Sequence, residues 1–371
     1  MGEKSNGKFQ INWLLITMSI KRTLKSCLQN VTIAGLFVLK FPLQLAGGRK
    51  RPEVFIDSLE KNNRFSVYLS IALASEYLIE IRIKDLPYFY RYLPFRDFLF
   101  KCVMLFPGKN PVAPLVLSRE SEKFLPWKQP IWIDGDYYSA RNRAVAHLIM
   151  PYFAHPTFYR KRLHLKSPAF RPGFRPFKIF FCGTLDKQSY ARSFRFPILN
   201  RHQIMEYIFQ HFPDHIANSM EGPRKAITIL TTDDTRDVVE KHPFSPVRYF
   251  QALSKADFFI APPGWVMPHC HNIIEAMTAG TIPITNYAQH FDPPLQNGTN
   301  CLSFASYEDL DVALRQAMQM PADRVDFLRR GTLDYYQRYL KPSSFGANFR
   351  RCWTPSMHLI VNQERADYAQ S

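Results

Sequence analysis

The sequence predicts an α/β fold with two doubly wound, Rossmann-like parallel-sheet domains that face a cleft. Short apolar runs that suit buried strands alternate with segments of helical periodicity along most of the chain. Several of these runs end in polar or aromatic residues, as expected where the strands of an open sheet reach a ligand-binding edge. The segment 167–176, SPAFRPGFRP, contains three prolines and one glycine and is predicted to link the two domains.

The composition favours a folded, basic protein. A chain of 371 residues, 46% of them hydrophobic, can form two domains of ordinary size. The formal net charge of +17 attracts anions such as anionic lipid, acidic glycans and phosphorylated small molecules. We expect no nucleic-acid partner, because the sequence contains no recognisable nucleic-acid-binding module. The six cysteines are scattered singly, which predicts free thiols and a cytoplasmic location.

The N-terminal segment 1–50 is basic and apolar. Its two apolar stretches, 11–20 and 31–46, are separated by basic residues, among them Lys21 and Arg22. Neither stretch suits a bilayer span, which takes about 20 apolar residues. No small-residue cleavage site follows, so we predict no signal peptide. The membrane alternative is a basic amphipathic segment that lies peripherally on an anionic surface.

The first domain is expected over residues 51–166. Its opening run, EVFID, is followed by residues at helical spacing and then by an alternating strand pattern, which together predict a βαβ unit. The predicted elements are strands at 53–57, 78–83, 130–133 and 146–150 and a helix at 66–77.

Polar residues follow three of these strands. Asp57 ends the first strand, Asp134 and Asp136 follow the third, and His155 lies shortly after the fourth. Because ligands gather at the carboxyl ends of parallel strands, these side chains are candidates for the cleft.

The second domain is expected over residues 177–345, and residues 346–371 are predicted to be a C-terminal tail. Strand and helix alternate throughout this domain, as in a doubly wound parallel sheet. The predicted elements are strands at 177–181, 226–230, 257–261 and 281–285 and helices at 198–212, 246–255, 268–279, 307–318 and 322–339.

The most informative stretch is 256–286, ADFFIAPPGWVMPHCHNIIEAMTAGTIPITN. A strand ends at the turn that contains Gly264, Pro268 suits the first turn of a helix, and Gly280 suits its C-terminal cap. The start of that helix should therefore face the cleft, where its N–H groups and partial positive charge favour a phosphate.

Three polar side chains share one face of this helix. His271 and Glu275 lie one turn apart, and Asn272 is also one turn from Glu275, so all three are expected to face one ligand. A carboxylate at this place can accept hydrogen bonds from the vicinal hydroxyls of a ribose. The alternative for Glu275 is an ordinary solvated or capping residue.

The motifs ADFFIAPPG and NIIEAMTAGTIPI resemble the C-terminal domain of exostosin-like and related GT-B glycosyltransferases, over about residues 177–341. The resemblance implies a GT-B fold and a nucleotide-sugar donor that is bound by Glu275. Asn272 departs from the family, which commonly has an arginine there. Without that arginine, the residue that binds the donor phosphate would be His269, His271 or an arginine elsewhere.

Two glycine-containing loops are further candidates for the donor site. Gly183 and Thr184 follow the first strand of the second domain, and Gly264 precedes the informative helix. Arg192 and Arg195 lie in the loop after Gly183, where a guanidinium can pair with a diphosphate. The alternatives are an ordinary strand-end glycine and a solvated basic loop.

The resemblance implies a sugar transfer to a glycan or lipid-linked acceptor in polysaccharide biosynthesis. The donor is expected to be a UDP-sugar, with a GDP-sugar as the alternative, and no metal or other cofactor is required. A GT-B enzyme takes its acceptor from the first domain. There Asp57, Asp134 and His155 are the alternatives for a general base, with Asp136 beside them.

Two other functions remain open. One is a GT-A glycosyltransferase that binds a divalent metal ion through Asp134 and Asp136 as a D-x-D site. The other is a non-catalytic glycan-binding or membrane-associated protein on a transferase fold. Metal dependence would distinguish the first alternative, and donor turnover would exclude the second.

Overall fold

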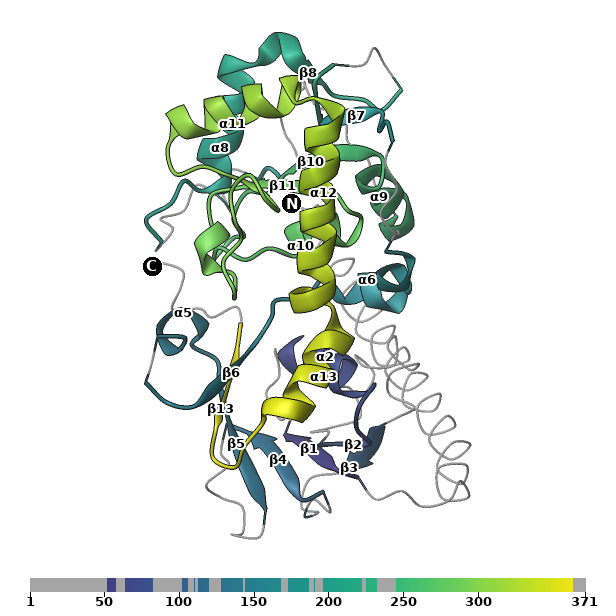
Figure 1. Cartoon of the computed structure of the whole chain (residues 1–371), viewed down its shortest axis with the longest axis vertical. Coiled ribbons are helices and arrows are strands. Elements are labelled where there is room, and N and C mark those ends of the chain that lie inside the picture. The colour runs from purple at the N-terminus through teal and green to yellow at the C-terminus, as the bar shows by residue number, and fades with distance from the viewer. Residues whose placement is uncertain are drawn as a thin grey trace, which may run out of the picture.

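The chain folds into two lobes, each built on a parallel sheet, as the computed structural model in Figure 1 shows. It describes residues 52–57, 64–82, 102–105, 110, 113–119, 128–142, 144–167, 173–186, 190, 196–221, 225–231 and 245–362. The segment 1–50, including the predicted interfacial stretches, lies outside these residues. No helix within the described ranges combines the length and the apolar character needed to cross a bilayer.

The first lobe, at the bottom of Figure 1, has a seven-stranded sheet in the order β3-β2-β1-β4-β5-β13-β6. Every neighbouring pair of strands runs parallel. The strands are β1 (Val54–Asp57), β2 (Ile79–Arg82), β3 (Cys102–Leu105), β4 (Leu115–Ser118), β5 (Gln129–Asp134), β6 (His147–Met150) and β13 (His358–Val361). The helices are α2 (Arg64–Leu73), α5 (Tyr137–Ala140), α6 (Pro156–Arg160), a 3₁₀ helix (Leu163–Lys166) and α13 (Pro342–Cys352).

The second lobe has a six-stranded sheet in the order β12-β11-β10-β7-β9-β8, again with parallel neighbours. Its strands are β7 (Phe177–Cys182), β8 (Ile216–Ala217), β9 (Ile227–Leu230), β10 (Ala256–Ile260), β11 (Ile282–Thr285) and β12 (Leu302–Ser303). Its helices are α8 (Arg201–His211), α9 (Pro246–Leu253), α10 (His271–Thr278), α11 (Tyr307–Gln319) and α12 (Ala322–Tyr335), with 3₁₀ helices at Pro213–His215 and Ala288–His290 and a π-helix at Tyr336–Leu340.

The predicted fold class is confirmed. Each strand that the sequence predicts is present, as β1, β2, β5 and β6 in the first lobe and β7, β9, β10 and β11 in the second. Every residue of β10 is buried, as expected for a parallel strand covered by helices on both faces of its sheet. Two parallel-sheet lobes are the arrangement of the GT-B type. The carboxyl ends of the strands in both sheets are therefore candidate positions for a ligand.

The segment 346–371 is not a tail where the structure describes it. In α13, Gly346 packs so closely on α2 that an added Cβ would lie 2.2 Å from the Ala72 carbonyl oxygen. The strand β13 then inserts between β5 and β6, with Leu359 and Val361 fully buried. A short strand whose parallel partners lie far away in the chain leaves no local pattern, so the sequence does not predict β13.

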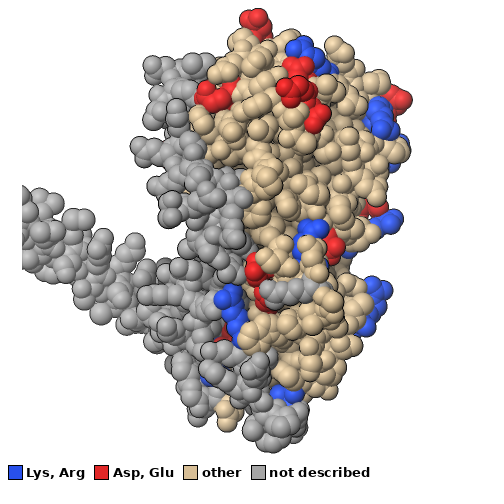
Figure 2. All heavy atoms as spheres, turned by 90° about the vertical axis from the view of Figure 1, so that its left-hand side faces the viewer, with Lys and Arg blue, Asp and Glu red and all other residues tan. Residues whose placement is uncertain are grey.

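Charged side chains are scattered over the face shown in Figure 2. Lysines and arginines stand singly or in small groups between uncharged areas, and acidic side chains gather towards the upper end. The net charge of +17 is therefore not collected in one continuous basic area on the described part of this face. Cys182, Cys270, Cys301 and Cys352 are free thiols, as predicted.

Replacing Gly346 by alanine is expected to destabilise the first lobe. Alanine favours a helix over glycine by about 1 kcal/mol, but its Cβ would collide with the Ala72 carbonyl oxygen, so α13 must move away from α2. We expect a net loss of about 1 to 3 kcal/mol in the free energy of unfolding, measured by urea denaturation. The control is Ala347→Ser, an exposed change on the same helix. Unchanged stability of Gly346→Ala would contradict this packing.

Candidate functional site

The helix α10 lies between β10 and β11 in the chain, so its first turn is at the carboxyl edge of the second sheet. It begins at His271, and the prediction that Pro268 lies in its first turn is wrong. The Pro268 carbonyl instead accepts the Gly264 N–H at 3.2 Å and closes a turn. Only glycine fits at position 264, because a Cβ would come within 2.8 Å of the His269 carbonyl oxygen. Gly280, with φ of 68°, ends the helix as predicted.

Glu275 lies on α10 at the junction between the lobes. Only 5% of its surface is exposed, and its Oε1 accepts the backbone N–H of His155 from the first lobe at 3.0 Å. Burial raises its pKa to about 7, while the hydrogen bond from His155 acts in the opposite direction. The sequence predicts a side chain open to the cleft, whereas the structure buries it in a contact between the lobes.

His271 is held by the first lobe as well. Its Nδ1 lies 2.7 Å from the Phe153 carbonyl oxygen, so this nitrogen is the protonated donor. Its Nε2 is then the acceptor for the Tyr152 hydroxyl at 3.3 Å in the neutral ring. The rings of Tyr152 and His271 stack with centroids 4.8 Å apart. The loop after β6 therefore holds the first turn of α10 by hydrogen bonds and ring stacking.

Asn272 joins α10 to the end of β7. Its Nδ2 donates to the Cys182 carbonyl at 3.3 Å, and its Oδ1 lies 3.4 Å from the Cys270 thiol. A Cβ added at Gly183 would be 3.3 Å from the same Nδ2, so the absence of a side chain leaves room for Asn272. The structure thus brings together two of the predicted donor-site residues, Gly183 and Asn272.

Arg201, the first residue of α8, connects the loops around the start of α10, and the sequence analysis did not single it out. Its guanidinium donates to the carbonyls of Pro263 (3.2 Å) and Thr184 (3.3 Å). It also donates to the Tyr190 hydroxyl (2.9 Å) and the Cys270 thiol (3.2 Å). Only 2% of its surface is exposed. Its position directly after the helix-capping Asn200 gives no local sign of this role.

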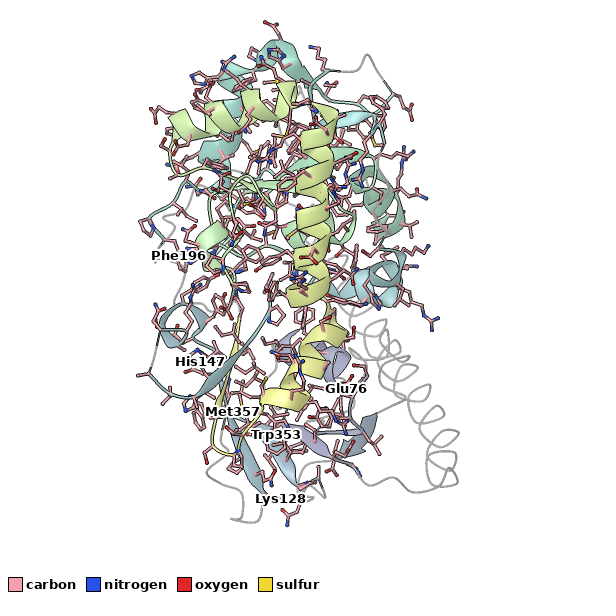
Figure 3. All side chains as sticks on the ribbon, in the orientation of Figure 1. Glu76, Lys128, His147, Phe196, Trp353 and Met357 are labelled. Carbon is pink, nitrogen blue, oxygen red and sulfur yellow. The ribbon has the colours of Figure 1, made fainter. Side chains whose placement is uncertain are left out.

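A second contact between the lobes involves α5. The Tyr138 hydroxyl lies 2.8 Å from Nδ1 of His269, and Tyr137 donates to the His290 carbonyl. Phe196, labelled in Figure 3, packs against the Tyr138 ring with centroids 4.6 Å apart. Burial holds the pKa of His269 well below its usual value. His269 is therefore neutral, which disfavours it as a cationic partner for phosphate.

The candidate bases of the first lobe have different surroundings. Asp57 forms an ion pair with Arg82, whose Nε lies 3.7 Å from Asp57 Oδ1. Its Oδ2 accepts a hydrogen bond from the Ser118 hydroxyl at 3.5 Å. The ring of His155 is exposed, and its Nδ1 accepts the Thr157 N–H at 3.2 Å. In the neutral ring the proton therefore lies on Nε2. Of these residues, His155 is the one that contacts α10.

Asp134 and Asp136 form a turn at the end of β5. Oδ1 of Asp134 accepts the Asp136 N–H at 2.8 Å. The described ranges contain no group of three or more His, Cys, Asp or Glu side chains placed around a common metal position. The two-lobed fold agrees with the GT-B expectation and not with the GT-A alternative for this D-x-D sequence. Arg192 and Arg195 lie outside the described residues.

Comparisons with known proteins show no family to which the chain belongs. No family model and no curated protein matches the chain. HepE from Anabaena, in complex with UDP and glucose, is 9% identical with a TM-score of 0.48, over 81% of this chain and 99% of that one. Sucrose-phosphate synthase from Thermosynechococcus elongatus is 12% identical with a TM-score of 0.45, over 81% and 98%. The α,α-trehalose-phosphate synthase of Burkholderia vietnamiensis is 11% identical with a TM-score of 0.35, over 79% and 80%. At these identities and TM-scores, the similarities support no statement about family or activity.

Glu275→Gln is expected to change how stability depends on pH. The glutamine still accepts the His155 N–H but does not ionise. The raised pKa of Glu275 means that its stabilising contribution is complete below pH 4.5, the ordinary value, and is lost as the pH rises through about 7.

We therefore expect the free energy of unfolding of the wild type, relative to Glu275→Gln, to fall by about 2 to 3 kcal/mol between pH 5 and pH 8. Urea denaturation across this range measures the difference. Glu308→Gln, an exposed change, is the control and should follow the wild type. Parallel pH curves for the wild type and Glu275→Gln would contradict the burial of an ionisable carboxyl here.

Proposed function

We propose that this chain is a glycosyltransferase that transfers a sugar from a nucleotide-sugar donor to a glycan or lipid-linked acceptor. One observation carries the proposal: the loop of Gly183 and Thr184, the Gly264 turn and the start of α10 converge at the carboxyl edge of the second sheet. Ligands of open α/β sheets bind at this edge, and a helix start favours phosphate. The first lobe closes over the same edge, as an acceptor domain would.

Glu275 is proposed to bind the ribose of the donor. Its Oε1 is engaged by the His155 N–H, while its Oε2 makes no hydrogen bond within the described part of the chain. A hydroxyl can therefore donate to Oε2 without displacing the first lobe. A second hydroxyl would have to compete with His155, so donor binding and lobe contact are coupled at this carboxyl.

His155 is proposed to contact the transferred sugar or its phosphate through Nε2–H. Because Nδ1 already accepts from Thr157, the neutral ring offers a hydrogen-bond donor and not a base. Asp134 is then the favoured general base among the three alternatives, since Asp57 is paired with Arg82. Asp134 also lies beside α5, which contacts the second lobe.

The remaining assignments follow the resemblance of the stretch 256–286. We propose an exostosin-like or neighbouring GT-B family, a UDP-sugar donor with a GDP-sugar as alternative, and no metal requirement. The first lobe is the acceptor domain and the second the donor domain, with β13 assigned to the first. We further propose a cytoplasmic enzyme whose segment 1–50 contacts an anionic membrane.

The proposal predicts that a nucleotide stabilises the purified protein. A ligand that binds only the folded state raises the melting temperature by mass action, so no acceptor needs to be known. In a thermal-shift screen of UDP, GDP, CMP and their sugar conjugates, we expect a rise with UDP and UDP-sugars in the absence of Mn²⁺. A rise only with Mn²⁺ would contradict the metal-free site. No response to any nucleotide would favour the non-catalytic alternative.

A further inference from the structure

Two arginines of the second lobe are almost completely buried, and their surroundings differ in charge. Arg329 on α12 has 1% of its surface exposed and forms ion pairs with Asp257 and Asp326. Lys178 also pairs with Asp257, at 3.5 Å. The charge of Arg329 is thus neutralised by carboxylates, as is usual for a buried ion.

Within the described part of the chain, Arg201 has no such partner. Its hydrogen bonds go to two carbonyls, a hydroxyl and a thiol, and no carboxylate lies within ion-pair distance among the described residues. Its guanidinium stacks over the Tyr190 ring at 4.2 Å, and the phenol of Tyr287 is also nearby. These contacts account for four of the five guanidinium N–H groups and leave a full positive charge, since an arginine does not deprotonate in a protein.

The charge of Arg201 lies against the start of α10. Arg201 donates to the thiol of Cys270, the residue that precedes this helix. Cys270 makes no side-chain capping hydrogen bond, so the partial positive charge of the helix start is not offset by a cap. The charge of Arg201 and the partial positive charge of the helix start therefore lie close together, beside the loops of Pro263 and Thr184. A bound anion would satisfy both.

We propose that Arg201 is a positioning residue for the diphosphate of the donor, an inference that rests on the proposed function. By holding the carbonyls of Thr184 and Pro263 it sets the separation of the two loops that border the start of α10. Its charge acts from beneath these loops and attracts the phosphates without contacting them. Arg201 thus supplies a positive charge near the start of α10, where Asn272 is a neutral residue.

The test measures how strongly phosphate contributes to binding. The full-length wild type, Arg201→Gln, Arg201→Lys and the matched control Arg329→Gln are titrated with inorganic pyrophosphate, uridine and UDP, and binding is followed by thermal shift and calorimetry. We expect Arg201→Gln to bind pyrophosphate and UDP about tenfold or more weakly and uridine unchanged, because a charge-assisted attraction is lost. Arg201→Lys should fall between the two, since it keeps the charge but not the four contacts.

The control separates this effect from loss of structure. Arg329→Gln leaves Asp257 buried without its guanidinium, so it should lower the melting temperature more than Arg201→Gln does. It should nevertheless keep the wild-type ratio of UDP to uridine affinity. An equal loss of this ratio in the Arg201 and Arg329 variants would overturn the inference, because it would then reflect general destabilisation.

The other outcomes are also decisive. If either Arg201 variant binds pyrophosphate and UDP as tightly as the wild type does, the proposed role of Arg201 is overturned. If the glutamine variant does not fold, the lysine variant alone decides. Equal binding of uridine and UDP by the wild type overturns the inference while nucleotide binding stands. A response to pyrophosphate but to no nucleotide supports the anion site and refutes the nucleotide-sugar proposal.

Discussion

The position of α10 is determined by hydrogen bonds from both lobes. Asn272 joins it to the end of β7, while Glu275 and His271 are held by the backbone of the loop after β6, at His155 and Phe153. Two of the side chains proposed to bind the donor, Glu275 and His271, therefore also contact the first lobe. Any separation of the lobes exposes these polar groups, and any ligand that binds them must share them with the first lobe. In the proposed function, donor binding and lobe movement are therefore coupled through the same few atoms.

The two buried ionisable groups around α10 respond differently to burial. Glu275 can become neutral, and its raised pKa indicates that burial favours the protonated form. Arg201 cannot, so its charge persists in the interior. Before a ligand binds, the start of α10 therefore combines a persistent cation with a carboxyl that is readily neutral. Among the described residues, the cation of Arg201 has no carboxylate partner, which suits the diphosphate of the proposed donor better than a neutral sugar alone.

Much of the fold and part of the site could be predicted from local sequence. The strands around α10 and the roles of Gly264 and Gly280 depend on neighbouring residues, because turn and cap geometry is set within a few positions. The start of α10 was misplaced at Pro268, since a proline suits both the first turn of a helix and a preceding turn. The sequence does not predict the four-residue strands β3 and β4 or the two-residue strands β8 and β12.

By itself, the sequence determined the alternation of strands and helices, the division into two parallel-sheet domains and the polar cluster of 256–286. These features arise from periodicity, glycine and proline, which act on adjacent residues. Only the tertiary structure decided that β13 belongs to the first sheet, that Glu275 is buried against His155 and that Arg201 has no carboxylate partner among the described residues. Such facts depend on contacts between residues far apart in the chain, whose pairing no local pattern records.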